Sequence, residues 1–282
     1  MRTRNNGWPR GATIWYENGV GCASVPFTWE CARVAETIRA STAPWWFVGG
    51  PGAVLQPEAF EGVPNVMMGR NWPGVLQRVN PRATRTTTGC VRRCGFCAVP
   101  QTEGAFRELE EWPDLPVLCD NNITAASEKH WHRVMDRLDK YADADFTQGI
   151  DCRLLKPYHA ERLARHGKMP IRLALDSNRD VPAWTEAWGL LRGEGIPKRR
   201  IRSYVLVGEP GTSVDDAWAR CTFVKQHGAL PLPMWWHPLD ACKRNAVTDA
   251  QMASGWSDYE RRRIMQWFYQ HKRAVPCRKS TK

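Results

Sequence analysis

The amino-acid sequence predicts an α/β protein in which six strand–helix units follow a small α/β domain. From about residue 83 the same unit recurs: a short apolar run, one or two polar residues, and then an amphipathic helix. Each crossover helix returns the chain to the same strand direction, so this alternation predicts a parallel sheet. The chain has 282 residues, of which 43% are hydrophobic, and this is enough to bury the core of a barrel-sized domain.

The six strands and the helices between them can be placed along the chain in order. The strands are predicted over residues 82–88, 115–119, 145–151, 171–175, 203–207 and 230–236. The helices are predicted over residues 127–141, 157–166, about 184–191, about 213–228 and about 257–273. Pro157 and Gly167 mark the two ends of one helix, and Ser213 with Asp216 forms a capping box at the start of another. Tryptophans on apolar helical stripes are expected in the core: Trp131, Trp184, Trp188, Trp218 and Trp267.

The chain is predicted to divide into two domains, residues 1–75 and residues 82–282. The first is predicted to be a Rossmann-like α/β layer with one helix over residues 28–40. Its strands are predicted over residues 13–16, 45–48 and 63–68. Residues 69–81 contain Pro73, Gly74 and Pro81 and are interpreted as the linker.

Polar side chains follow the predicted strands at the points where the strands end. They are Asp120, Asn121, Gln148, Asp151, Asp176, Glu209 and His237. Barrel enzymes place their chemistry at the carboxyl ends of the strands, so the pattern predicts that these side chains line a pocket. Two alternatives stay open: Asp120 and its neighbours as a plain turn, and Asp176 as a helix cap.

Three cysteines lie close together in the loop after the first of these strands. Cys90, Cys94 and Cys97 have the spacing Cys-x3-Cys-x2-Cys, with Phe96 directly before the third. Iron–sulfur cubanes usually take four cysteines, so a triplet without a near fourth suggests a [4Fe–4S] cluster with one open iron. The alternatives are a structural zinc site, which normally needs four N or S ligands, and three unrelated buried cysteines.

The cysteine motif resembles the signature of the radical S-adenosylmethionine (radical SAM) enzymes, including the aromatic residue at Phe96. The resemblance implies a partial (β/α)6 barrel, a [4Fe–4S] cluster on the three cysteines, and oxygen sensitivity. It also implies that the reduced cluster cleaves SAM to a 5′-deoxyadenosyl radical, which abstracts hydrogen from a substrate. The electron would come from a donor of the flavodoxin or ferredoxin type.

The resemblance also implies roles for residues around the cluster. Phe96 is expected near the adenine of SAM, and the strand end Asp120, Asn121 and Asn122 near its amino group. Gly208 and Glu209 resemble the fifth-strand element that lies close to SAM. From their strand-end positions, and because carboxylates accept two hydroxyl hydrogen bonds well, ribose or substrate contacts are expected from Gln148, Asp151 and Asp176. Arg153 and His237 are weaker candidates for substrate binding, and a surface ion pair is the alternative for Arg153.

The N-terminal segment resembles a trimmed form of the cobalamin-binding domain that precedes many radical SAM barrels. Gly49 and Gly50 stand in the place of that domain's glycine pair. The Asp-x-His-x-x-Gly motif that supplies a cobalt-ligating histidine is absent, and residues 1–129 contain no histidine. Cobalamin is therefore predicted to be an improbable cofactor, and the segment is interpreted as a docking or lid domain.

The net charge of +11 and the pI near 9.4 permit contact with a polyanion such as RNA. Ala98-Val99-Pro100 after the cysteines is similar to the methylthiotransferase branch of the family, which favours RNA or nucleotide modification. No RNA-binding module accompanies the charge, so a peptide or a small metabolite stays open as the substrate.

The cellular location is predicted from the absence of export and membrane signals. The basic start of the chain is followed by no apolar leader, and no stretch approaches the ~20 apolar residues of a membrane span. The ten cysteines are irregularly spaced, which indicates a reducing compartment. A cytoplasmic protein without membrane contact is therefore expected.

Overall fold

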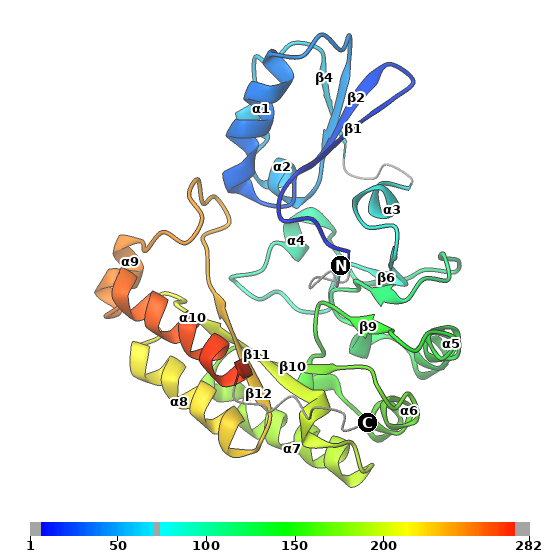
Figure 1. Cartoon of the computed structure of the whole chain (residues 1–282), viewed down its shortest axis with the longest axis vertical. Helices are drawn as coiled ribbons and strands as arrows, with labels where there is room; N and C mark the ends of the chain where they lie inside the picture. Colours follow the sequence, from blue (N-terminus) through cyan, green and yellow to red (C-terminus); the bar gives the residue numbers. More distant parts are fainter. Residues whose placement is uncertain (1–6, 70–73, 274–282) are drawn as a thin grey trace, which may run out of the picture. The chain divides into compact units, whose positions relative to one another are not determined.

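A computed structural model describes residues 7–69 and 74–273 of the chain (Figure 1). These residues form two units. The first unit runs to Gln148 and also contains the later segment Pro238–Arg244. The second contains Gly149–His237 and the chain from Asn245 onward. The predicted domain boundary at residues 75–82 stays a prediction.

The N-terminal sheet has four strands in the order β1-β2-β3-β4. They are β1 (Thr13–Glu17), β2 (Val20–Ser24), β3 (Trp46–Gly49) and β4 (Val66–Met68). β1 and β2 are antiparallel, whereas β3 and β4 continue the sheet in parallel with β2. β2 was not predicted, because Val20-Gly21-Cys22-Ala23-Ser24 lacks a clear alternation. Asn18 and Gly19 have positive φ values, 53° and 78°, as a two-residue hairpin turn requires.

One face of this sheet carries the hydrophobic core of the N-terminal region. The predicted helix over residues 28–40 is present as η1 (Thr28–Glu30) and α1 (Cys31–Arg39), and α2 (Pro51–Leu55) and η2 (Pro57–Phe60) follow β3. Val34 and Ile38 of α1 pack in one cluster with Val25, Trp46 and Val48. The glycine pair belongs to this packing: a Cβ on Gly50, which has φ +94°, would lie 2.6 Å from the Val25 oxygen.

A second sheet of the first unit is parallel and has the order β5-β8-β9. Its strands are β5 (Ala83–Thr84), β8 (Val117–Leu118) and β9 (Asp145–Phe146), and α3 (Val75–Val79) precedes it within the predicted linker. The predicted strand over residues 82–88 is divided: β6 (Thr87–Thr88) leaves the sheet and pairs antiparallel with β7 (Arg107–Glu108). α4 (Val99–Thr102) lies between these two strands, and η3 (Ile123–Ala125) and α5 (Glu128–Leu138) follow β8.

The segment Pro238–Arg244 belongs to the first unit although its neighbours in sequence belong to the second. The Thr28 hydroxyl donates to the Ala241 oxygen at 2.7 Å, and the Gln56 amide donates to the Asp240 oxygen at 3.1 Å. These hydrogen bonds attach the segment to η1 and to the start of η2.

The second unit is built on the parallel sheet β10-β11-β12. The strands are β10 (Ile171–Leu175), β11 (Ile201–Val207) and β12 (Leu230–Trp235), close to the predicted ranges. The predicted helices are present as α6 (Pro157–Arg165), α7 (Val181–Gly193), α8 (Val214–Gln226) and α10 (Asp258–Arg273), and Figure 1 shows α7, α8 and α10 beside this sheet. Shorter elements are η4 (Cys152–Leu154), η5 (Asn178–Asp180), η6 (Lys198–Arg200) and α9 (Asp249–Ala253), of which α9 was not predicted.

The tryptophans expected on helical stripes take part in packing. Trp131 and Trp184 are fully buried, and Trp188 stacks on Trp184 with ring centroids 5.5 Å apart. Trp218 and Trp267 contact each other edge to face at 5.6 Å.

The fold is thus mixed α/β with parallel sheets, as predicted. Within residues 7–69 and 74–273 the sheets have two to four strands and none closes on itself, so the partial six-stranded barrel is not confirmed. No helix in the described part of the chain is long and apolar enough to cross a membrane.

Candidate cluster and cofactor site

The three cysteines of the motif lie on a loop that the β6–β7 hairpin closes at its base. Gly89 begins this loop with φ +67°, and a Cβ at this position would lie 2.2 Å from the Ala105 oxygen. The backbone therefore approaches the returning chain too closely for any other residue. Cys90, Cys94 and Cys97 are half-buried thiols that form no disulfide, and the N–H of Cys97 donates to the Cys94 oxygen at 3.0 Å.

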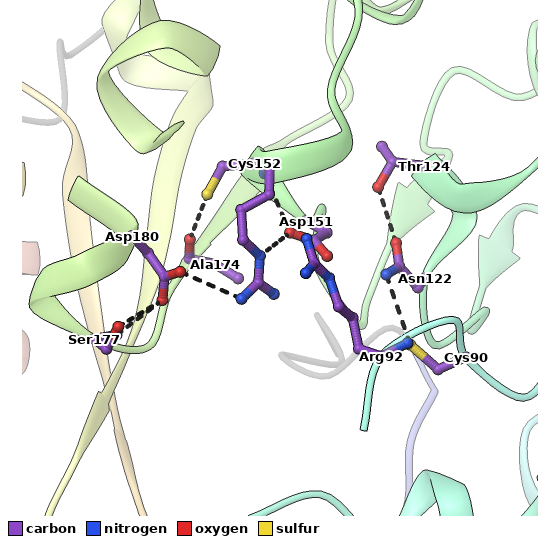
Figure 2. A network of polar contacts seen from close by, with 10 residues as sticks. Cys90, Arg92, Asn122, Thr124, Asp151, Cys152, Ala174, Ser177 and Asp180 are labelled. Carbon is purple, nitrogen blue, oxygen red and sulfur yellow. Dashed lines mark hydrogen bonds and ion pairs between the residues drawn. The ribbon is translucent and has the colours of Figure 1, made fainter. Parts of the chain in front are cut away.

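The sulfur of Cys90 accepts two N–H groups. The backbone N–H of Arg92 donates at 3.3 Å and the Asn122 amide donates at 3.6 Å (Figure 2). Thr124 donates to Oδ1 of Asn122 at 2.9 Å, which orients the amide toward the sulfur. N–H donors around cysteine sulfur stabilise a thiolate ligand and tune a metal centre.

The donor set fits a [4Fe–4S] cluster in its chemistry: three thiols on one loop, with N–H groups at one of them. No group of three or more His, Cys, Asp or Glu side chains within the described ranges is arranged to hold a metal ion. In a cubane each iron takes its own thiolate, so the ligands stand further apart than those of one ion. The assignment of the three cysteines as cluster ligands stays a prediction.

Glu103 was not among the predicted site residues, yet it fixes the base of the cysteine loop. Its Oε1 pairs with Arg85 at 2.8 Å, and its Oε2 accepts the N–H of Gly89 at 3.0 Å and the Asn121 amide at 2.7 Å. Glu103 therefore connects three places: the residue that follows β5, the start of the cysteine loop, and the segment that follows β8. No local sequence signal points to it, because its partners lie up to 18 positions away.

Asp120 also holds the backbone that leads into the loop. Its Oδ1 accepts the N–H groups of Thr86 and Thr87, both at 2.7 Å, and its Oδ2 accepts the Thr86 hydroxyl at 2.7 Å. Burial raises the pKa of this carboxyl, and the hydrogen bonds from Thr86 and Thr87 oppose that rise. The same contacts explain why the chain leaves the sheet at residue 86: the N–H groups of Thr86 and Thr87 are bound by a side chain. A role of Asp120 in SAM binding stays a prediction.

In the second unit, two predicted site residues form one ion-pair network. Arg153 donates through Nε to Oδ1 of Asp151 at 2.7 Å and through Nη1 to Asp180 at 3.3 Å (Figure 2). Asp180 in turn accepts the N–H and hydroxyl of Ser177 at 3.1 and 3.0 Å. Arg153 is thus engaged by two carboxylates of its own unit, and Asp180 rather than Asp176 makes the capping contact that follows β10.

Asp176 lies beside this network at the end of β10. Burial raises the pKa of its carboxyl to about 6; Asp180, Asp151 and Glu209 add to the rise, and Arg153 opposes it. Burial also raises the pKa of Glu209. Gly208 has φ +82°, and a Cβ there would lie 2.4 Å from the Trp235 ring, so this position packs the end of β11 closely against that of β12.

The remaining predicted residues have different surroundings. Gln148 is exposed and is one of the residues that line a cavity of the first unit, and Phe96 is half-buried in the cysteine loop. His237 accepts the N–H of Asn245 through Nε2 at 3.0 Å, a contact that holds the chain where it returns to the second unit. Substrate binding by His237 and Arg153 stays a prediction.

Comparisons with known proteins extend these observations. No protein-family model and no curated protein matches the chain significantly. Among solved structures, the radical SAM methyltransferase TsrM from Kitasatospora setae, with cobalamin and a [4Fe–4S] cluster bound, has a TM-score of 0.52 and 14% identity over 75% of this chain and 60% of that chain. Coproporphyrinogen III oxidase (HemN) from Escherichia coli, a radical SAM enzyme, has a TM-score of 0.40 and 14% identity over 56% of this chain and 40% of that chain.

The likeness to TsrM confirms, at the level of the fold, the resemblance predicted from the cysteine motif: the fold of this chain is similar to that of a radical SAM enzyme. The chain spans about 60% of the length of TsrM. Because the TsrM structure contains cobalamin, the comparison does not support the prediction that cobalamin is an improbable cofactor.

Proposed function

We propose that this protein is a radical SAM enzyme in which Cys90, Cys94 and Cys97 hold a [4Fe–4S] cluster. The observation that carries the proposal is the three-cysteine loop, closed by a hairpin and supplied with N–H donors at Cys90. With both cofactors bound, the cluster would pass one electron to SAM, whose sulfonium carbon–sulfur bond would break to give methionine and a 5′-deoxyadenosyl radical.

The chain's own residues have three tasks in this proposal. Glu103 and Gly89 fix the backbone at the base of the loop, and this backbone positions the three cysteines. Asn122 and the N–H of Arg92 stabilise the thiolate of Cys90. Asp120 binds the N–H groups of Thr86 and Thr87, which keeps both residues out of the parallel sheet β5-β8-β9 and directs the chain into the loop. A flavodoxin- or ferredoxin-type donor would supply the electron.

We propose a peptide or a small metabolite as substrate in preference to RNA. Two basic runs of the sequence, residues 198–202 and residues 261–263, contribute to the net charge. In the first run, Arg200 is buried and donates to the Leu163 oxygen at 2.8 Å and the Met169 oxygen at 3.1 Å. On α10, Arg261 pairs with Asp258 at 2.6 Å, and Arg263 pairs with Glu260 at 2.8 Å. Arg200 is therefore not available to a phosphate, and Arg261 and Arg263 each have an acidic partner on the same helix.

Anaerobic reconstitution tests the proposal. We expect about four iron and four sulfide per chain, and loss of both in Cys94→Ala, because each cysteine binds one iron. Cys242→Ala, which removes an exposed thiol outside the loop, serves as the control and should keep the full content. The reduced protein should cleave SAM to methionine and 5′-deoxyadenosine, measured by chromatography.

Two results would contradict the proposal. One is full iron and sulfide in the Cys94→Ala protein. The other is tightly bound zinc, at one ion per chain, that survives anaerobic reconstitution and is lost in the same variant; it would favour a zinc-stapled protein.

A further inference from the structure

The segment Pro238–Arg244 brings a second cysteine to the helix that contains Cys31. Cys242 is exposed on this segment, and Cys31 is fully buried at the start of α1. Thr28 lies three positions before Cys31, about one helical turn away. Its hydroxyl donates at 2.7 Å to the oxygen of Ala241, the residue directly before Cys242. Two thiols that are distant in the sequence are therefore held near the same helical turn.

Gln56 provides a second contact between this segment and the N-terminal core. Its side-chain amide donates to the sulfur of Cys242 at 3.5 Å and to the oxygen of Asp240 at 3.1 Å. Gln56 directly precedes η2, whose Phe60 packs in the same buried cluster as Cys31. The sulfur of Cys242 thus lies against the first unit, although the residue as a whole is exposed.

The electrostatics of Cys31 agree with this proximity. Burial raises the pKa of the Cys31 thiol to about 11, and the charges of Glu58, Cys242 and Glu30 add to the rise. A charged group shifts the pKa of another group in this way only when the two are close. Cys31 therefore stays a neutral thiol near pH 7, and Cys242 is the sulfur that a dissolved oxidant reaches first.

We propose that Cys31 and Cys242 are a redox-sensitive pair, which hydrogen peroxide converts into a disulfide between α1 and the segment Pro238–Arg244. In a reducing compartment both residues stay thiols, and hydrogen bonds attach the segment. The disulfide makes the attachment covalent. Because the segment is exposed around Cys242, its backbone can adjust to the Cα separation of about 4.4–6.8 Å that a disulfide requires.

The reaction has two steps. The thiolate of Cys242 attacks one oxygen of the peroxide, the O–O bond breaks, and the sulfur becomes a sulfenic acid while hydroxide leaves and is protonated to water. The sulfur of Cys31 then attacks the sulfenic sulfur, and the thiol proton of Cys31 combines with the departing hydroxide to give a second water. Two thiols are oxidised by two electrons, and one peroxide is reduced to two waters.

The disulfide should stabilise the folded protein. A crosslink removes conformational freedom from the unfolded chain, and the effect grows with the length of the closed loop. The loop from Cys31 to Cys242 contains every strand from β3 to β12. We expect the thermal midpoint of the peroxide-treated protein to lie at least about 5 °C above that of Cys242→Ala treated in the same way.

Oxidation of the full-length protein tests the proposal. The protein is treated with a small molar excess of hydrogen peroxide, the remaining thiols are blocked with N-ethylmaleimide, and disulfides are mapped by mass spectrometry. Digestion with trypsin and a glutamyl endopeptidase separates Cys31 from Cys22, because Glu30 lies between them. We expect a peptide pair that joins Cys31 to Cys242, and dithiothreitol should abolish it. Absence of this pair would overturn the proposal.

Variants assign the stabilisation to this pair of thiols. Cys31→Ala and Cys242→Ala should both lack the increase in thermal midpoint. Because Cys242 is exposed, its variant keeps the test valid even if Cys31→Ala fails to fold. Cys22→Ala, which removes another buried thiol of the first unit, is the matched control and should keep the linked peptides and the increase. An equal increase in Cys242→Ala would contradict the proposal.

Oxidation in concentrated urea separates a pair positioned by the fold from random pairing. In an unfolded chain, Cys242 would join Cys221, about 20 positions away, about 30-fold more readily than Cys31, about 210 positions away. In the folded protein Cys221 is buried in α8. We expect the pair with Cys31 to dominate in the folded protein and the pair with Cys221 to dominate in urea. The same ratio of the two pairs under both conditions would overturn the proposal.

The failures of the two proposals can be distinguished, because none of these variants removes a cysteine of the motif. All of them should keep the full iron and sulfide content after reconstitution. If the linked peptides are absent while the cluster forms, the disulfide proposal is overturned and the radical SAM proposal stands. If the linked peptides are present and no cluster forms, the disulfide proposal stands and the proposed function is wrong.

Discussion

Asp176 is a carboxyl group held among other carboxyl groups. Its pKa is raised to about 6 by burial and by Asp180, Asp151 and Glu209, against an ordinary value near 4. A raised pKa means that the folded state binds the proton more tightly than the unfolded state does. The ionised form therefore destabilises the fold above pH 6, and this penalty disappears as the pH falls from 6 toward 4.

We predict from this that Asp176→Asn stabilises the protein at pH 7.5 by about 1–3 kcal/mol. The advantage should shrink as the pH is lowered through 6, because the wild-type carboxyl then becomes neutral too. Urea unfolding at pH 7.5 and pH 4.5 measures both values. An equal stabilisation by Asp176→Asn at both pH values would contradict the prediction.

Single residues also show what the sequence could not reveal. The cysteines and the strand-end polar residues were found from spacing and position alone. Glu103 and the structural role of Asp120 were not, because each acts through hydrogen bonds to residues that only the folded chain brings close. The Asp120 contact also divides the predicted strand over residues 82–88, since a carboxylate 33 and 34 positions away binds the N–H groups of Thr87 and Thr86.

At the scale of elements, the helices were the more predictable part. α5, α6, α8 and α10 lie within a few residues of their predicted ranges, because their apolar stripes and caps are local signals. β2 was missed although Asn18-Gly19 is a strong hairpin signal. α9 was missed because its start, a capping box of Thr248 and Gln251, is followed by only one turn and a half of helix.

The cysteine loop contains two glycines, Gly89 and Gly95, each next to a cysteine of the motif, and we predict different effects of replacing them. Gly89→Ala should lower the iron content of reconstituted protein by at least about half, because φ +67° and the contact with Ala105 exclude a Cβ. Gly95→Ala should leave the iron content unchanged, since a Cβ there would meet no atom within 4 Å. Iron and sulfide assays on both variants, prepared in parallel, decide this. Equal iron in the two variants would show that the base of the loop tolerates a side chain.

The whole molecule has a net charge of +11, which by itself does not indicate an RNA-binding surface. We predict that RNA binding, if any is detected, has a shallow salt dependence. A nucleic-acid site that neutralises several single-stranded phosphates would give a log–log slope of about −0.7 for each. The measurement is a binding titration with single-stranded RNA from 50 to 200 mM salt.

The variant that tests this prediction must spare Arg200, which is buried and bonded to backbone oxygens. Lys198→Glu with Arg199→Glu changes the exposed part of the same run. We expect little effect of this pair on RNA binding and on SAM cleavage. A steep slope that the pair abolishes would restore RNA as a binding partner.

The attachment of Pro238–Arg244 to the first unit has a consequence for the order in which the protein can fold during synthesis. Its hydrogen bonds to Thr28 and Gln56 span 213 and 184 positions. A ribosome delivers the chain from its N-terminus, so β10, β11 and β12 have all been made before Ala241 reaches Thr28. The first unit therefore starts to be synthesised first but cannot complete its folding until residues 238–244 are available. Its last contacts can form only when most of the chain has left the ribosome.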